Sequence, residues 1–458
     1  MKKTILMMML GGAWPCAADV TLPKVLTDHM VLQRGEPITV WGWADAGEKV
    51  SVTLAGTSKQ TNADAEGNWK VTLPKRGLGD ALTMKVKGKN EIVLKDILMG
   101  DVWLCSGQSN MEWGIGLSEN PKQAIQAASH PKIRLLNVNK VKSGKPLPDV
   151  AKASGWKVCS PETISNLGDK PRKGFSSVGY FFGVHLQQEL KNVPIGLIAS
   201  SWGGTRIEPW TTPSGRDAIP ELKGKKGDYS KLYNGMVHGL APLRIKGAIW
   251  YQGESNRKDG ALYHHKKRAL VAGWREIWGK EMPFYFVQLA PFGYPKDSPE
   301  VLPVIWQAQS ESNASIPHTG MAVTIDIGNP KDIHPKKKKE VGQRLALLAL
   351  KDTYGKDVVA YSPTYVSHVV KRGKVVLTFK DVASGLATRD GKAPMAFEVA
   401  GSDGKFVPAK ARISGSNQVT LESDGVKNPK SVRYAWSNTP VTNLMNQEGL
   451  PVPCFQAK

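Results

Sequence analysis

The alternation of strand-like and helix-like segments between Asp101 and about residue 350 constrains the fold most. Short apolar runs typical of buried strands alternate with segments whose apolar residues recur every three or four positions. The first expected strand contains Val102 and Leu104. The others cover Ile195–Ser201, Gly247–Gln252, Phe284–Leu289 and Met321–Asp326. The expected helices cover Ser177–Leu190, Tyr263–Gly279 and Val304–Ser312, with a last helix opening at Pro335. This order predicts an α/β domain, a parallel sheet with helices on both faces.

Both flanks of this region carry the pattern of short β-strands separated by Gly and Asp turns. On the amino-terminal side, strands are expected at Ile38–Trp43, Val50–Leu54 and Trp69–Leu73. On the carboxyl-terminal side, they are expected at Val375–Phe379, Phe397–Ala400 and Val432–Trp436. Strands of this length and spacing are typical of β-sandwiches. We therefore expect β-sandwich modules at residues 19–98 and 353–458 around an α/β domain at residues 99–352.

Residues 1–18 have the pattern of a secretory signal peptide. Lys2 and Lys3 form a basic start, an apolar stretch follows from Ile5 to Trp14, and small residues precede residue 19. The apolar stretch is too short to span a bilayer. The sequence predicts an exported, periplasmic or extracellular protein with no integral membrane segment; the alternative is a cytosolic protein with an apolar start.

The charge of the chain is strongly positive. Lys and Arg number 62 against 40 Asp and Glu, a formal net charge of +22, or +20 once Lys2 and Lys3 are removed. Positive charge attracts polyanions. An exported protein meets little nucleic acid, so acidic glycans fit better as partners, and surface lysines that maintain solubility are the alternative. The three cysteines after residue 18 form no C-x-x-C pair, and we expect no metal and no organic cofactor.

Four polar turns follow expected strands of the α/β domain. They are Gly107–Asn110, Ser201–Arg206, Gln252–Asn256 and Asp332–Pro335. Ligands of open parallel sheets bind beyond the carboxyl ends of the strands. Ser109 stands at the start of a helix, where it could be only an N-cap. Because His334 belongs to another of the converging turns, a nucleophilic role for Ser109 is favoured.

These motifs resemble those of the sialate O-acetylesterases, carbohydrate esterases of the SGNH hydrolase superfamily. The resemblance covers nearly the whole chain after residue 18. Its motifs lie at Asp28–Arg34, Val40–Trp43, Cys105–Trp113, Ser201–Ile207, Tyr233–Met236, Trp250–Asn256, Asp332–Pro335 and Val432–Trp436. The resemblance implies an SGNH-hydrolase-like fold.

The resemblance also implies that Ser109 is the nucleophile and His334 the general base. Many SGNH enzymes carry the acid three positions before the histidine, where this chain has Lys331. Asp332 precedes His334 by two positions, and residues two apart in extended chain point the same way. We therefore expect Asp332 to be the acid. The alternatives are a Ser–His pair without an acid, or an acid supplied by Glu254 or Asp326.

For the oxyanion hole, the resemblance implies a glycine N–H and a side-chain amide. The glycine is Gly203 or Gly204, and the sequence does not choose between them. The amide is expected from Gln252 rather than Asn256, because Gln252 ends its strand. The N–H group of Ser109 would be a further donor.

Three residues near the turns are candidate substrate contacts. Arg206 could bind a carboxylate in bidentate fashion, or it could form a structural salt bridge. Trp202 could stack on a sugar or belong to the core. Glu254 is the remaining candidate for the substrate site.

The predicted function is that of an exported serine esterase that removes O-acetyl groups from sugars through an acyl-enzyme on Ser109. O-acetylated sialic acids are the favoured glycan substrates, with no nucleic-acid partner. One alternative keeps the chemistry and acts on acetylxylan or another hemicellulose. The other alternative is a non-catalytic glycan-binding protein. Replacement of Ser109 or His334 by another residue would have favoured this alternative, but both residues are present.

Overall fold

Seven strands, mostly parallel, form the central path of an eleven-stranded sheet in the described part of the chain. The computed structural model describes residues 19–168 and 173–458, so the predicted signal peptide lies outside the described residues. The strand order is β13-β12-β11-β7-β10-β8-β9, and only β9 at the edge is antiparallel to its neighbour. The strands are β7 (Glu91–Gly107), β8 (His130–Asn137), β9 (Lys157–Cys159), β10 (Ile195–Ser201), β11 (Gly247–Tyr251), β12 (Phe284–Val287) and β13 (Thr319–Ala322).

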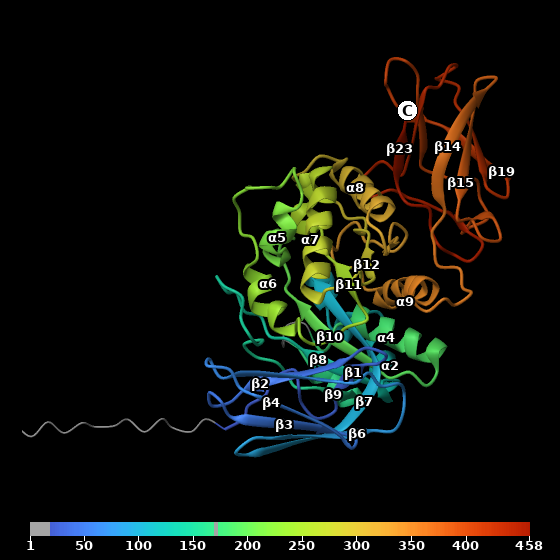
Figure 1. Cartoon of the computed structure of the whole chain (residues 1–458). Helices are drawn as coiled ribbons and strands as arrows, with labels where there is room; N and C mark the ends of the chain where they lie inside the picture. Colours follow the sequence, from blue (N-terminus) through green and yellow to red (C-terminus); the bar gives the residue numbers. More distant parts are fainter. Residues whose placement is uncertain (1–18, 169–172) are drawn as a thin grey trace, which may run out of the picture.

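Helices cover both faces of this sheet (Figure 1). Trp103 and Cys105 pack in one apolar cluster with residues of α4 (Ser177–Leu190) and α9 (Lys338–Leu348). Val102 and Leu104 belong to a second cluster, which includes residues of α7 (Leu262–Trp278) and α8 (Val301–Ser315). Alternate residues of a strand point to opposite faces, which explains this division. The predicted α/β fold is confirmed.

Strand β7 is shared between the central sheet and the amino-terminal part of the chain. Its first half pairs with β6 (Leu82–Lys87) and β1 (Val31–Gln33), and its second half lies between β10 and β11. The boundary expected between residues 98 and 99 therefore falls inside one continuous strand. Buried Asp101 strengthens the junction, because Arg34 Nη2 and Gln33 Nε2 each donate to it at 2.9 Å.

The remaining amino-terminal strands form short antiparallel pairs around β7. They are β2 (Ile38–Trp43), β3 (Lys49–Leu54), β4 (Thr57–Asn62) and β5 (Asn68–Leu73). Short helices occupy the loops of the central domain. They are α1 (Ser109–Glu112), α2 (Pro121–Gln126), α3 (Pro161–Asn166), α5 (Pro213–Asp217) and α6 (Lys231–Met236), with 3-10 turns η1 (Ile115–Leu117), η3 (Glu208–Trp210), η4 (His238–Leu240) and η5 (Glu254–Asp259).

The carboxyl-terminal module contains two four-stranded antiparallel sheets and lies beside α8 (Figure 1). A π-helical turn, η6 (Ala349–Thr353), leads into it. One sheet contains β14 (Thr364–Lys371), β15 (Lys374–Lys380), β20 (Gln418–Glu422) and β19 (Lys410–Gly415). The other contains β18 (Val407–Pro408), β17 (Phe397–Ala400), β21 (Ser431–Tyr434) and β23 (Phe455–Ala457), and β16 (Leu386–Thr388) pairs with β22 (Leu444–Asn446).

Two expected elements near the site differ from the structure. The expected strand Met321–Asp326 ends at Ala322, and the guanidinium of Arg344 then binds both the Val323 carbonyl and the Asp326 carboxylate. The helix expected at Pro335 begins at Lys338. His334 therefore lies in a loop just before the helix.

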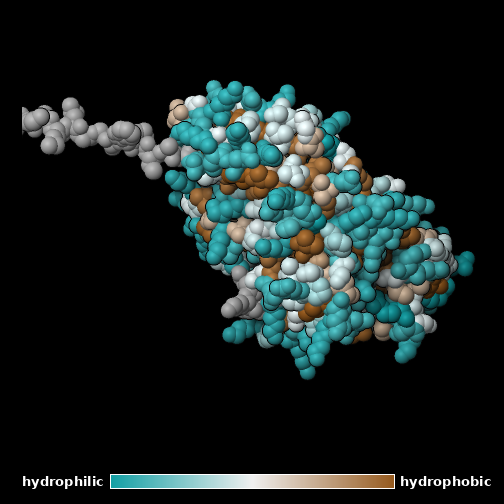
Figure 2. All heavy atoms as spheres, turned by 90° about the horizontal axis from the view of Figure 1, so that it is seen from below, coloured by the Kyte–Doolittle hydropathy of each residue, from teal (hydrophilic) through white to brown (hydrophobic). Residues whose placement is uncertain are grey.

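The surface is largely polar, and the cysteines lie in the interior. On the face shown in Figure 2, hydrophilic residues cover most of the surface and hydrophobic ones form small scattered groups. Cys105, Cys159 and Cys454 are buried free thiols. Among residues 19–168 and 173–458, none of the helices has the length and apolar character needed to cross a bilayer.

Candidate active site

Three polar turns meet because β7, β10 and β11 end in the same register. Gly107 of β7 lies opposite Ser201 of β10 and Tyr251 of β11. Gly107 has a φ of +137°, and a Cβ atom there would collide with the backbone of Tyr251. Only glycine suits this close approach. The strand ends thus bring Gly107–Asn110, Ser201–Arg206 and Gln252–Asn256 to one edge, as the sequence predicted.

Ser109 lies at this edge with His334 beside it. Ser109 Oγ is 3.0 Å from His334 Nε2, and the serine is 8% exposed. Gln108, not Ser109, occupies the N-cap position of α1, so the N-cap interpretation of Ser109 is wrong. The pair has the hydrogen-bond geometry of a nucleophile and its general base.

Trp113 holds the imidazole of His334 in a way that the sequence interpretation missed. The two rings stack with their centroids 4.2 Å apart and their planes 16° from parallel. Trp113 follows Ser109 by four positions, a separation that places side chains on one side of a helical turn. The four-residue spacing between Ser109 and Trp113 could therefore have predicted that Trp113 lies near the serine and its base.

Asp332 lies near the ring nitrogen of His334 that faces away from Ser109, although Ile333 and His334 form a bend rather than the extended chain that the prediction assumed. Its Oδ1 atom accepts a 2.9 Å hydrogen bond from the backbone N–H of His334 and lies 3.8 Å from the ring atom Nδ1. The longer distance is an ion-pair distance rather than a hydrogen bond. The Asp332 side chain is also 40% exposed. Asp326 is bound instead by Arg344 and Arg389, which removes it as the acid.

Asp332→Asn is expected to lower kcat for ester hydrolysis only about 10- to 100-fold, whereas loss of a buried, hydrogen-bonded triad aspartate costs about 10⁴-fold. Water and the 3.8 Å separation weaken the carboxylate's effect on the imidazole. Steady-state kinetics of purified wild type and variant measure the ratio. A loss near 10⁴-fold would show that Asp332 closes on the imidazole during turnover.

A buried polar cluster lies behind the serine and the histidine. Asn110 Nδ2 donates to Glu254 Oε1 at 2.5 Å and to the carbonyl of Ile333 at 3.1 Å. Lys338 Nζ donates to Asn110 Oδ1 at 2.5 Å. Asn110 therefore ties the nucleophile turn to the turn after β11 and to the loop that carries His334.

Burial dominates the electrostatics of this cluster. Glu254 is 5% exposed and Lys338 is fully buried. Loss of hydration raises the pKa of Glu254 and lowers the pKa of Lys338 to about 7. Glu254 is held inside the cluster rather than at the surface of the site, which contradicts its predicted role as a substrate contact.

The glycine turn after β10 contains the candidate oxyanion donors. The N–H of Gly203 donates to Glu112 Oε2 at 2.6 Å, and Lys140 Nζ binds the same carboxylate at 2.5 Å. Gly204 is exposed and adopts a φ of +77°. Because Glu112 already engages Gly203, Gly204 and Ser109 are the stronger candidates for backbone donors.

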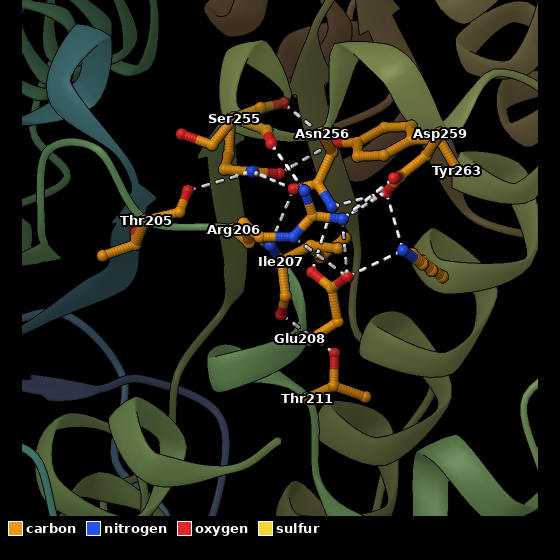
Figure 3. Close-up of polar contacts among 11 residues, drawn as sticks. Thr205, Arg206, Ile207, Glu208, Thr211, Ser255, Asn256, Asp259 and Tyr263 are labelled. Carbon is orange, nitrogen blue, oxygen red and sulfur yellow. Dashed lines mark hydrogen bonds and ion pairs between the residues drawn. The ribbon is translucent and has the colours of Figure 1, made fainter. Parts of the chain in front are cut away.

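The two amides predicted for the oxyanion hole are directed elsewhere, as Figure 3 shows for Asn256. Gln252 Nε2 donates to Asn256 Oδ1 at 2.7 Å and to the Thr205 carbonyl at 3.1 Å. Asn256 Nδ2 donates to Glu208 at 3.0 Å and to Asp259 at 2.7 Å. Each amide thus uses both of its hydrogens, and both side chains are fully buried. The prediction that Gln252 or Asn256 donates to the oxyanion does not agree with this arrangement.

Arg206 forms the structural salt bridge that was the alternative to carboxylate binding. Its guanidinium donates to Glu208 and Asp259 at 2.9 to 3.2 Å and to the Ser255 carbonyl at 2.9 Å (Figure 3). Lys266 binds the same two carboxylates. Burial raises the pKa of Glu208, but hydrogen bonds from Lys266, Asn256 and Arg206 outweigh it and lower that pKa to about 2. Arg206 therefore stabilises the loop.

Trp202 lies half-buried beside two lysines. Its backbone N–H donates to the Gly107 carbonyl at 3.0 Å, which fixes it next to the nucleophile turn. Lys140 Nζ and Lys142 Nζ lie 6.0 and 5.4 Å from the centre of its ring. Sequence reasoning missed both lysines, because they come from the loop after β8 and belong to none of the polar turns.

Comparisons with known proteins point to one family of esterases. Residues 99–351 match the family described as carbohydrate esterase, sialic acid-specific acetylesterase. The chain is 32% identical to the sialate O-acetylesterase of Homo sapiens over 91% of this chain and 87% of that protein. It is 29% identical to the sialate O-acetylesterase of Mus musculus, over 91% and 89% of the two chains. A crystal structure of a carbohydrate acetylesterase from Xanthomonas citri superposes with a TM-score of 0.89 at 38% identity, covering 96% of this chain and all of that one.

These matches and the fold define a carboxylic ester hydrolase of the carbohydrate esterase class. The chain belongs to the family of sialic acid-specific acetylesterases.

Proposed function

We propose that this enzyme removes acetyl groups from sugars through an acyl-enzyme on Ser109, and that O-acetylated sialic acids are its substrates. The 3.0 Å separation between Ser109 Oγ and His334 Nε2 carries the proposal, because it is the geometry of proton transfer from the attacking hydroxyl. The backbone N–H groups of Ser109 and Gly204 are the proposed oxyanion donors, each worth about 3–4 kcal/mol of transition-state stabilisation.

The reaction follows in two halves. His334 takes the proton of Ser109 as Oγ attacks the acetyl carbonyl, and the tetrahedral intermediate collapses with release of the sugar oxygen, which His334 protonates. Water then loses a proton to His334 and attacks the acetyl-serine, which releases acetate and returns the proton to Ser109. Asp332 stabilises the imidazolium electrostatically in both halves, and Trp113 keeps its ring in place.

Three observations bear on the choice of sugar. The mammalian relatives carry the name sialate O-acetylesterase, and Lys142, exposed beside Trp202, offers a cation and an aromatic face for an acidic sugar. The engagement of Arg206 by Glu208 and Asp259 favours a neutral acetylated sugar instead, because it removes the predicted carboxylate ligand. Acetylxylan is therefore the second candidate. Export through residues 1–18 belongs to the same proposal and rests on their sequence pattern.

The test compares acetate release from O-acetylated sialic acid and from acetylxylan, with wild type and with Ser109→Ala. Wild type is expected to release acetate from sialic acid with the higher kcat/KM, and the alanine variant to release none above background. Full activity in Ser109→Ala would refute the mechanism. Release from acetylxylan alone would refute the proposed substrate and leave the mechanism standing.

A further inference from the structure

A second cavity lies outside the serine–histidine site, between helices α2, α4 and α9. Its volume is about 490 Å³, within the range of pockets that hold small molecules. Each of the three helices contributes one glutamine to its lining: Gln123 from α2, Gln188 from α4 and Gln343 from α9. Amide side chains both donate and accept hydrogen bonds, as sugar hydroxyls do.

Two buried polar atoms of the lining have no protein partner. His185 Nε2 and Glu340 Oε2 are shielded from solvent and make no hydrogen bond to any described residue. Buried polar atoms are usually hydrogen-bonded, so these two side chains of the cavity wall keep hydrogen-bonding capacity that the protein does not use. Burial also lowers the pKa of His185, which favours its neutral form.

The other lining residues suit an uncharged, ring-shaped ligand. Phe181 is half-buried, and its ring centre lies 5.1 Å from that of Tyr180. Aromatic faces of this kind pack against the C–H face of a sugar. Two carboxylates, Glu119 and Glu340, are balanced by two ammonium groups, Lys336 and Lys339. This balance favours a neutral ligand over an anion.

The cavity shares a wall with the catalytic loop. Lys336 follows His334 by two residues, so their Cα atoms are at most about 7 Å apart. The backbone N–H of Glu119 donates to the Lys336 carbonyl at 2.8 Å and joins the α2 side of the cavity to that loop. We infer that the cavity binds a neutral sugar unit of the glycan whose acetylated sugar reacts at Ser109; this inference rests on the proposed function.

Gln123→Trp tests the inference, because an indole at this position fills the cavity from α2. Gln126→Trp is the matched control, since Gln126 is exposed on the same helix and does not line the cavity. The substrates are O-acetylated sialic acid and O-acetylated sialyllactose, which adds a neutral disaccharide. Gln123→Trp is expected to lower kcat/KM about tenfold for the larger substrate and to leave the smaller one unchanged. Gln126→Trp is expected to change neither.

If Gln123→Trp has the same ratio of the two kcat/KM values as wild type, the inference is overturned. Activity of the enzyme on both substrates would still support the proposed function. Inactive wild type would refute the proposed function, and the cavity is then tested by binding alone. Saturation-transfer NMR with unacetylated sialyllactose should show contact to the lactose protons in wild type and Gln126→Trp. Loss of the lactose contact in Gln123→Trp supports the inference. The inference is overturned if the contact persists in Gln123→Trp, or if wild type shows no contact. If acetylxylan is the substrate that releases acetate, acetylated xylose and xylotriose replace the sialic acid pair.

Discussion

His334→Ala is expected to lower kcat for sugar-acetate hydrolysis by about 10⁶-fold, the loss seen when a serine hydrolase loses its base. The imidazole of His334 lies 3.0 Å from Ser109 Oγ and is the group proposed to accept the serine proton in both halves of the reaction. Ser109→Ala is expected to lose a similar factor. The double variant should lose no more than either single variant, because the two side chains act as one unit. Acetate release by concentrated enzyme over long incubation measures these residual rates.

Trp113→Phe is the control for this prediction. It keeps an aromatic ring against the imidazole, so it is expected to retain most of the activity while the protein stays folded. A double variant much slower than both single variants would contradict the proposed cooperation, because independent contributions multiply.

Asn110→Ala is expected to lower the free energy of unfolding by about 3–5 kcal/mol, because it leaves two buried polar groups unpaired at a cost of about 1–3 kcal/mol each. Asn110 is hydrogen-bonded to both Glu254 and Lys338, and alanine can replace neither bond. The same change removes the donor to the Ile333 carbonyl, next to His334, so kcat should fall as well. Urea unfolding followed by fluorescence, together with kinetics on the folded variant, measures both effects.

Glu254→Gln is the matched variant for Asn110→Ala. It keeps an oxygen that can accept from Asn110 Nδ2 and removes only the ionisable group, whose pKa burial already raises. Its cost is expected to stay near 1 kcal/mol, the worth of an ordinary hydrogen bond. If Asn110→Ala cost no more than Glu254→Gln and kept full kcat, the cluster would have no part in positioning His334.

The parts of the site that could be predicted from sequence depend on local pattern. The limits of α4 and β10 agree with the expected Ser177–Leu190 and Ile195–Ser201, because apolar periodicity encodes them directly. The place of Ser109 follows from parallel strands that end at one edge, whereas His334 reaches it through the loop between β13, which ends at Ala322, and α9. Asp332 lies near the imidazole, but through a turn in which its carboxylate accepts from the His334 backbone N–H, not through the extended chain that the prediction assumed.

The direction of side chains within the turns could not be predicted in this way. Whether Asn256 points to the serine or away depends on Glu208 and Asp259, which compete for its amide hydrogens. The direction of the Arg206 side chain is likewise set by its salt bridges to Glu208 and Asp259 rather than by a ligand. These outcomes are decided by charges from separate segments that meet only in the folded protein, and no spacing rule contains them.

Strand β7 has a consequence for the order in which the active site forms. Its first half needs a partner 67 positions earlier, where Gln33 pairs with Gly100, and its second half needs one 144 positions later, where Gly247 pairs with Trp103. Pairings of such long range are slow, since the entropy of closing the intervening chain must be lost before the contacts form. The turn that carries Ser109 is therefore expected to assemble late, after segments from both ends of this span have docked. Acquisition of activity during refolding reports the completion of the whole sheet rather than of one local motif.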